Sequence, residues 1–144
     1  MAAYATYFVS LKVLLRTGDK GLFLRCGKDH WCGAPHWDWP GGRIDSAENE
    51  TAISEIIKRE VEEELGKDLK YNLGSLAFQF RRYLPRIDKW IFINVYEAEH
   101  VSGEIKLSNE HSDFEWIDFK NTMFDCKDFC NKEMYQGLMQ YLMK

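Results

Sequence analysis

Apolar residues recur at two spacings along the chain, and these spacings separate expected strands from expected helices. Aromatic and β-branched residues dominate 7–15 and 21–25, and the polar Thr17-Gly18-Asp19-Lys20 lies between them. This pattern predicts two strands joined by a turn. Other apolar runs predict further strands over 37–39, 76–83, 90–98 and 115–119.

Two segments instead repeat apolar residues every three or four positions, which predicts helices. The first has an apolar stripe made of Ala52, Ile53, Ile56, Ile57, Val61 and Leu65. The second covers 128–143, with Phe129, Tyr135, Leu138, Met139 and Leu142 facing inward. Strands, helix, strands and helix follow one another without a linker, so we expect an α/β fold and a single domain over 1–144.

The first expected helix also carries a cluster of acidic side chains. Glu60, Glu63 and Glu64 stand at i, i+3 and i+4, which places three carboxylates on one helix face. Like charges so close together oppose folding unless a cation neutralises them, and hard cations such as Mg²⁺ take oxygen ligands of this kind. Pro40-Gly41-Gly42 lies upstream and allows a tight turn that brings a backbone carbonyl near the same ion.

These residues resemble the box of the MutT-like Nudix hydrolase family. That box reads Gly, five residues, Glu, seven residues, Arg-Glu, an aliphatic residue, any residue, Glu-Glu, any residue and Gly. The chain matches its second half from Arg59 to Gly66 and its first half from Gly42 to Glu48.

Between the two halves the chain has the ten residues 49–58 where the family has seven. Either Glu48 or Glu50 takes the first acidic position of the box. Three residues added within a helix would rotate everything beyond them by about 300°. We therefore expect the extension in the loop or at the start of the helix.

The resemblance implies a Nudix α/β/α sandwich with a central mixed β-sheet. It also implies a Mg²⁺-dependent pyrophosphohydrolase, with Mn²⁺ as a possible substitute, acting on a nucleoside triphosphate, a dinucleoside polyphosphate or a similar compound. The implied metal ligands are Glu60, Glu63, Glu64 and the carbonyl of Gly41. The alternative is a Nudix domain that binds a nucleotide without hydrolysing it, as a sensor or partner module.

Arg59 is expected to pair with Glu63 at i+4 and to steady the box. The resemblance implies that Glu60 or a downstream carboxylate accepts the proton of the attacking water. That carboxylate is expected to be Glu110, in a loop just before the strand that contains Glu115 and Trp116. The sequence leaves the choice between Glu60 and Glu110 open.

Four residues are expected to bind the substrate: Arg25, Trp39, Arg81 and Tyr83. Relatives often place a phosphate-binding arginine where Arg25 stands, and Tyr83 lies near a tyrosine found in related diadenosine-polyphosphate hydrolases. Either Trp37 or Trp39 is expected to line a base pocket. Arg81 and Arg82 point to opposite faces of a strand, so at most one of them enters the site.

The distribution of charge bears on which partners the protein can bind. The net charge is −4, and 48–64 holds seven acidic and two basic side chains, which leaves the remainder near neutral. We therefore expect neither stable nucleic-acid binding nor membrane binding, and a homodimer is left open.

The chain has four cysteines, Cys26, Cys32, Cys126 and Cys130, and His30 and His36 lie nearby in the sequence. The spacings of these cysteines do not match a zinc knuckle. Free thiols in a cytoplasmic protein are expected instead.

Overall fold

The computed structural model describes residues 2–28 and 36–144, and a seven-stranded sheet forms its centre. The sheet runs in the order β3-β2-β1-β6-β5, with β4 also paired to β1 and β7 to β2. β1 and β6 are parallel and the other pairs are antiparallel, so the sheet is mixed, as predicted. The strands are β1 (Phe8–Thr17), β2 (Lys20–Cys26), β3 (Trp37–Asp38), β4 (Gly41–Arg43), β5 (Lys70–Leu84), β6 (Lys89–Ser102) and β7 (His111–Asp118).

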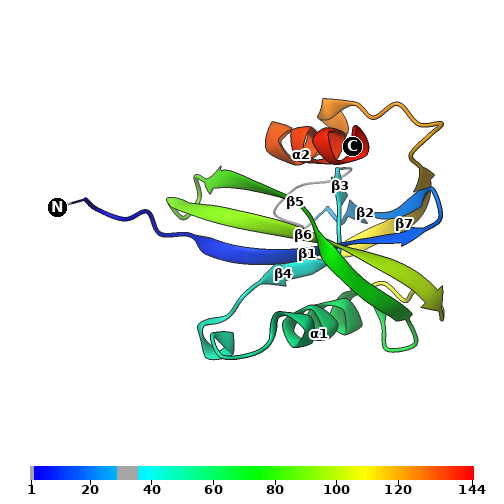
Figure 1. Cartoon of the computed structure of the whole chain (residues 1–144), viewed down its shortest axis with the longest axis horizontal. Helices are drawn as coiled ribbons and strands as arrows, with labels where there is room; N and C mark the ends of the chain where they lie inside the picture. Colours follow the sequence, from blue (N-terminus) through cyan, green and yellow to red (C-terminus); the bar gives the residue numbers. More distant parts are fainter. Residues whose placement is uncertain (1, 29–35) are drawn as a thin grey trace.

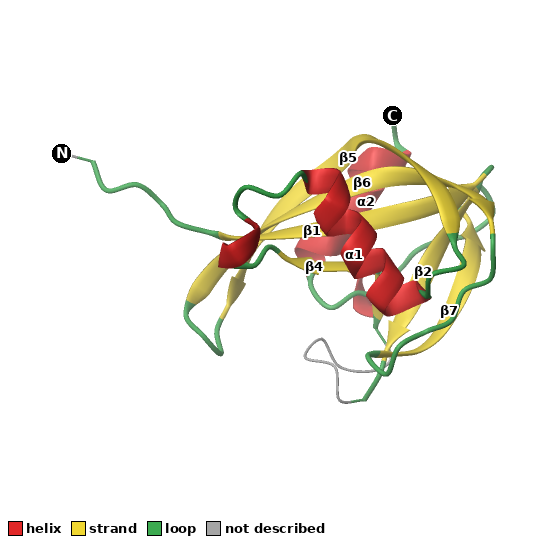
Figure 2. Cartoon of the chain, turned by 90° about the horizontal axis from the view of Figure 1, so that it is seen from below, coloured by secondary structure: helices red, strands yellow, loops and turns green. Residues whose placement is uncertain are grey.

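Two α-helices cover opposite faces of this sheet, α1 (Ile53–Leu65) on one and α2 (Lys132–Leu142) on the other (Figure 1). Figure 2 shows α1 lying across the strands. Ile56, Ile57, Val61 and Leu65 of α1 pack into one apolar cluster, and Met134 and Leu138 of α2 pack into a second. The predicted α/β/α sandwich is confirmed, and its two cores follow from the apolar stripes of the two helices.

The boundaries differ from the expectations in two places. Gly41–Arg43, expected only to end a strand, forms β4 and pairs with Ser10, Leu11 and Lys12. The last helix begins at Lys132 rather than at residue 128, because Phe129 is extended and the Asn131 side chain caps the helix by accepting a hydrogen bond from the Met134 N–H. Cys126–Asp128 forms a separate turn of 3₁₀ helix, η2.

The box extension lies before α1. Ser46–Glu48 forms a turn of 3₁₀ helix, η1, in which Asp45 and Glu48 cap each other. Ala52 is the residue before α1, so the first four of the ten residues 49–58 precede the helix. The expected position of the extension, ahead of the acidic cluster, agrees with this arrangement.

The cysteine expectation needs one correction. Cys26 and Cys126 are free, but Cys130 is disulfide-bonded, so the prediction of free thiols is wrong at Cys130. Cys32 and His30 lie outside the described residues. Within 2–28 and 36–144, no helix combines the length and the apolar composition that a membrane span requires.

Candidate active site

The side chains of the three clustered glutamates of α1 line one cleft. The apolar stripe of the helix faces the sheet, so Glu60, Glu63 and Glu64 are left on the side that lines a cleft of about 780 Å³. Gly41, Gly42 and Glu110 line the same cleft. The structure thus brings together the residues that the sequence predicted as the metal cluster, and it adds residues from β1, β5 and β6.

Arg59 pairs with three carboxylates around this cluster. Its guanidinium lies 2.9 Å from Glu48, 3.0 Å from Glu60 and 3.2 Å from Glu63. The expected i,i+4 pair with Glu63 is therefore present. Of the two candidates for the first acidic position of the box, Glu48 is the one that pairs with Arg59, which ties η1 to α1.

Glycine is required where β4 meets α1. A Cβ atom at Gly42 would lie 2.7 Å from a carboxylate oxygen of Glu60, so a side chain there would displace this carboxylate from the strand. Gly41 has a φ of +137°, and a Cβ there would lie 2.0 Å from the backbone oxygen of Leu11. The two glycines hold the backbone against the acidic face of the helix.

Glu64 forms the buried half of the cluster. Its exposed fraction is only 5%, and its carboxylate accepts a 2.7 Å hydrogen bond from the backbone N–H of Gly41. Burial raises the pKa of Glu64 to about 9, because desolvation outweighs the opposing effects of Lys12 and of the Gly41 N–H. Glu64 is thus largely protonated at neutral pH when no cation is bound.

Lys12 is a site residue that the sequence reasoning missed. Its ammonium lies 3.3 Å from Asp38 and donates hydrogen bonds to the backbone oxygens of Trp39 and Gly41, at 3.2 and 3.3 Å. Burial opposes its charge, but Asp38 and Glu64 more than offset this and raise the pKa of Lys12. The Gly41 carbonyl, an expected metal ligand, is therefore engaged by Lys12. A lysine within the apolar run of β1 was the available signal.

The loop before β7 brings Glu110 to Glu64. One possible ligand atom from each of Glu64, Glu110 and His111 lies within 4.8 Å of the others. His111 is buried, and its Nε2 lies 3.3 Å from Asp38. The expected downstream carboxylate is thus beside the acidic cluster, although the role of Glu110 stays a prediction.

The residues expected to bind substrate lie outside the lining of this cleft. Trp39 is fully buried against Phe23 and Phe78, so the expectation that it faces a nucleobase is corrected. Arg25 lies 3.6 Å from the centre of the Trp37 ring, and Trp37 is also buried.

Arg81 and Tyr83 lie on the other face of β5, whereas Arg82 lines the cleft. Alternation along β5 predicted that only one of the two neighbouring arginines would enter; the structure selects Arg82 where the sequence analysis selected Arg81.

Helices on both faces of a mixed sheet, with a glycine turn against an acidic helix face, define a Nudix-type sandwich. The family model of the NUDIX domain matches residues 6–138, so the chain belongs to the Nudix family. The predicted family and the predicted enzyme class, a Nudix hydrolase, are confirmed.

Solved structures show the same fold. A MutT protein from Methanosarcina mazei Go1 is 24% identical, with coverage of 97% of this chain and 96% of that chain and a TM-score of 0.75. A Nudix hydrolase from Nitrosomonas europaea is 17% identical, with coverage of 94% and 88% and a TM-score of 0.73. An ADP-ribose pyrophosphatase from Streptococcus suis 89-1591 is 16% identical, with coverage of 96% and 91% and a TM-score of 0.61. The search of curated proteins found no match.

Proposed function

We propose that the chain is a Mg²⁺-dependent pyrophosphohydrolase that cleaves the diphosphate linkage of a nucleotide or nucleotide derivative, such as a nucleoside triphosphate or a dinucleoside polyphosphate. The observation that carries this proposal is the convergence of Glu60, Glu63, Glu64 and Glu110 on one cleft. The similar ADP-ribose pyrophosphatase from S. suis supports a substrate with a nucleoside diphosphate unit.

The residues of the cleft fit a hard divalent cation. Their donors are carboxylate oxygens, which suit Mg²⁺ and Mn²⁺, and the raised pKa of the buried Glu64 means that a cation can take the place of its proton. A bound cation neutralises phosphate charge and lowers the pKa of water, which diphosphate hydrolysis requires. Glu60, Glu63 and Glu64 are the proposed ligands, and Gly41 joins them if Lys12 releases its carbonyl.

Each remaining charged group has a role that its position suggests. Arg59 holds Glu60 and Glu63 in place through its ion pairs. Arg43 and Arg82 line the cleft and place positive charge where the phosphates of a substrate would lie. Either Glu60 or Glu110 accepts the proton of the attacking water. Burial raises the pKa of Glu60, which brings it closer to the value that suits a base at neutral pH.

Turnover of a substrate panel tests this proposal. ATP, a dinucleoside tetraphosphate and ADP-ribose are each incubated with about 5 mM Mg²⁺ or with EDTA, because a hard-cation site must respond to both. Hydrolysis that EDTA abolishes is the expected result. Tight nucleotide binding without turnover of any compound would instead identify a sensor or partner module.

A cytoplasmic location stays a prediction from the sequence.

Glu110→Gln separates the two candidate bases. Loss of a general base costs typically 10²–10⁴-fold in turnover, so we expect a fall within that range if Glu110 takes the proton. The fall is measured under saturating Mg²⁺, so that weaker metal binding does not contribute. A loss of less than about tenfold would assign the proton transfer to Glu60.

A further inference from the structure

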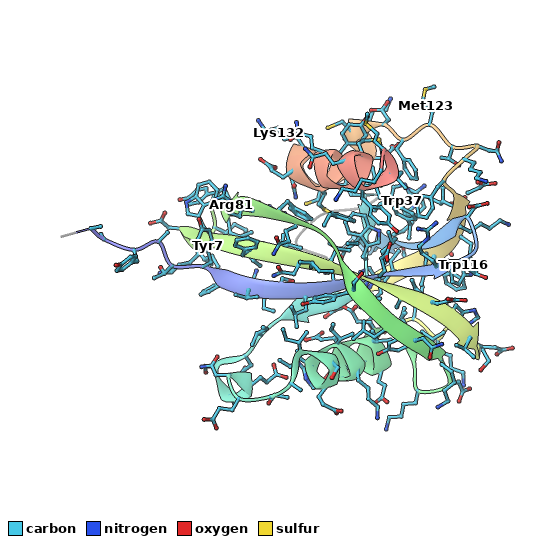
Figure 3. The ribbon with its side chains drawn as sticks, in the orientation of Figure 1. Tyr7, Trp37, Arg81, Trp116, Met123 and Lys132 are labelled. Atoms are coloured by element: carbon cyan, nitrogen blue, oxygen red, sulfur yellow. The ribbon has the colours of Figure 1, made fainter. Side chains whose placement is uncertain are left out.

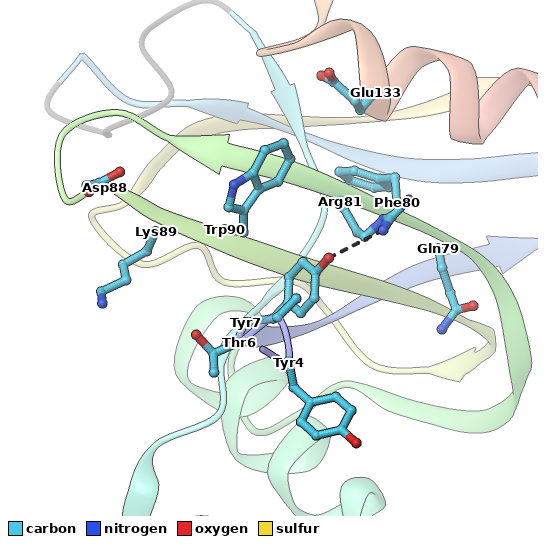
Figure 4. Close-up of a pocket in the computed structure, with 11 residues that line it drawn as sticks. Tyr4, Thr6, Tyr7, Gln79, Phe80, Arg81, Asp88, Lys89, Trp90 and Glu133 are labelled. Atoms are coloured by element: carbon cyan, nitrogen blue, oxygen red, sulfur yellow. Dashed lines mark hydrogen bonds between the residues drawn. The ribbon is translucent and has the colours of Figure 1, made fainter. Parts of the chain in front are cut away.

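A second cleft, of about 840 Å³, lies where the N-terminal segment meets the tip of β5 and β6 (Figure 4). It shares no lining residue with the cleft that contains the glutamates of α1. Its volume falls in the range that accommodates small-molecule ligands. The residues that the argument below uses are Tyr7, Arg81, Asp88, Lys89, Trp90 and Glu133.

The two clefts are lined by different residues of the same two strands, β5 and β6. Arg82 pairs with Ile91 and lines the first cleft, whereas Arg81 and Trp90 are their neighbours and line the second. Because successive strand residues point to opposite faces, Arg81 and Trp90 lie on the opposite face of the β5–β6 tip from Arg82 and Ile91. Figure 1 shows that this tip extends beyond α1, so the helix leaves this part of the sheet uncovered.

Aromatic side chains gather on this uncovered part. The Trp90 side chain is 51% exposed, and its ring lies 5.6 Å from that of Tyr83, which is 39% exposed. Tyr7 packs edge-on against Phe92 at a similar distance. Figure 3 shows Tyr7 and Arg81 together, far from Trp116 at the other end of the sheet. An exposed indole on a strand provides a flat surface on which a nucleobase can stack.

Positive charge stands beside this aromatic surface. The Arg81 guanidinium makes one hydrogen bond, of 3.3 Å, to the Tyr7 hydroxyl, which fixes its position (Figure 4). Within 2–28 and 36–144, neither Arg81 nor Lys89 forms an ion pair. A guanidinium has five N–H donors, so Arg81 keeps several for an anion such as a phosphate.

Two carboxylates, Asp88 and Glu133, also line the cleft, and among the described residues neither forms an ion pair with Arg81 or Lys89. Asp88 accepts a hydrogen bond from the Tyr83 hydroxyl. Glu133 extends from α2, at the other end of the cleft from Lys89 (Figure 4). Carboxylates accept hydrogen bonds from hydroxyl groups, and a nucleotide offers these on its ribose.

We propose that the cleft between the N-terminal segment and the β5–β6 tip binds a free nucleotide, whose base stacks on Trp90 and whose phosphate contacts Arg81. This site is separate from the cleft of the proposed hydrolysis and holds its ligand without a metal. The base, the phosphate and the ribose each meet a group of matching chemistry: an exposed indole, a guanidinium with N–H donors to spare, and a carboxylate.

Titration with ADP in EDTA tests this site, with the tryptophan indole N–H signals followed by NMR. The chain has five tryptophans, and Trp90→Ala identifies the signal of Trp90 by its disappearance. We expect the Trp90 signal to shift and saturate in the unaltered protein. Arg81→Met should weaken the binding by about tenfold, because a charge-assisted contact to phosphate is lost, and Arg81→Lys should restore part of it.

Arg82→Met is the matched control, because it removes the same kind of side chain one position along the strand but in the other cleft. It should change the dissociation constant reported by Trp90 by less than about twofold. Equal effects of the two substitutions, or no shift of the Trp90 signal, would overturn the proposal.

A single-stranded pentanucleotide is titrated in parallel. Tighter binding of the pentanucleotide than of ADP would overturn the free nucleotide as the ligand. A protein that hydrolyses its substrate with Mg²⁺ but shows no Trp90 shift would refute the second site alone, and the proposed hydrolysis would stand.

Discussion

Glu63 and Glu64 are neighbours on α1 and line the same cleft, yet they lie in opposite environments. The Glu63 side chain is 58% exposed and pairs with Arg59, whereas Glu64 is buried and accepts a backbone hydrogen bond from Gly41. Solvent and Arg59 surround the Glu63 carboxylate, while burial raises the pKa of Glu64 to about 9. The comparison shows that the acidic cluster has a solvated half and a buried half.

The repulsion between the crowded carboxylates is reduced in different ways in the two halves of the cluster. Arg59 interacts with three of them, the exposed Glu63 and the partly buried Glu48 and Glu60. In the buried half, a proton on Glu64 removes one charge, and Lys12 compensates Asp38. The buried half is therefore the part whose electrostatics a divalent cation would change most.

The largest expected effect is on turnover. Glu63→Gln and Glu64→Gln each remove a proposed ligand, so each should lower Mg²⁺-dependent turnover by about a thousandfold, equivalent to several kcal/mol of lost charge stabilisation. Circular dichroism of both variants should match the unaltered protein. If either variant kept its activity while remaining folded, that glutamate would not belong to the metal site.

Removal of Lys12 should produce the next largest effect, on stability. Lys12→Met removes the ammonium that pairs with the buried Asp38, and breaking a buried pair typically costs about 3–5 kcal/mol in the free energy of unfolding. Lys120→Met is the control, because its ion pair with Asp19 is exposed and such pairs contribute less than about 1 kcal/mol. Similar losses in urea unfolding for the two variants would argue against a buried Lys12–Asp38 pair.

Glu64 should also make the metal-free protein less stable as the pH rises. The pKa of Glu64 is raised from 4.5 to about 9, so the folded state keeps a proton that the unfolded chain releases. The contribution of this proton to the free energy of unfolding is fully present below pH 4.5 and is lost as the pH rises to about 9. In EDTA at neutral pH, Glu64→Gln should therefore be more stable than the unaltered protein by on the order of 2–3 kcal/mol.

The measurement is urea unfolding of both proteins across this pH range. A parallel pH dependence for the unaltered protein and Glu64→Gln would mean that Glu64 titrates normally.

The smallest effect is expected at the exposed neighbour. Glu63→Gln removes a solvent-screened ion pair with Arg59, so the free energy of unfolding should fall by less than about 1 kcal/mol. The same urea experiments report this value. A loss as large as that of Lys12→Met would show that the two halves of the cluster are not energetically distinct.

Sequence pattern was sufficient to predict the fold, because the apolar stripes of both helices and the alternation in the strands are local properties. The cluster of Glu60, Glu63 and Glu64 followed from helical spacing in the same way. Spacing does not report which of two neighbouring glutamates is buried, since that depends on β4 lying against α1.

The positions of three residues could not be predicted from the sequence, because each depends on how distant segments pack together. Lys12 acquires its role only when β1 and the turn after β3 come together. Alternation along β5 separated Arg81 from Arg82 but did not identify which of the two side chains borders the cleft. Trp39 stands next to the glycines in the sequence, yet its side chain enters the core beneath α2.

The central claim is that Glu64 is held protonated until a cation replaces its proton. Calorimetric titration with Mg²⁺ near neutral pH, in buffers of different ionisation enthalpy, measures the protons released on binding. The account predicts release of close to one proton per ion from the unaltered protein and almost none from Glu64→Gln. Mg²⁺ binding to the unaltered protein without proton release would contradict it.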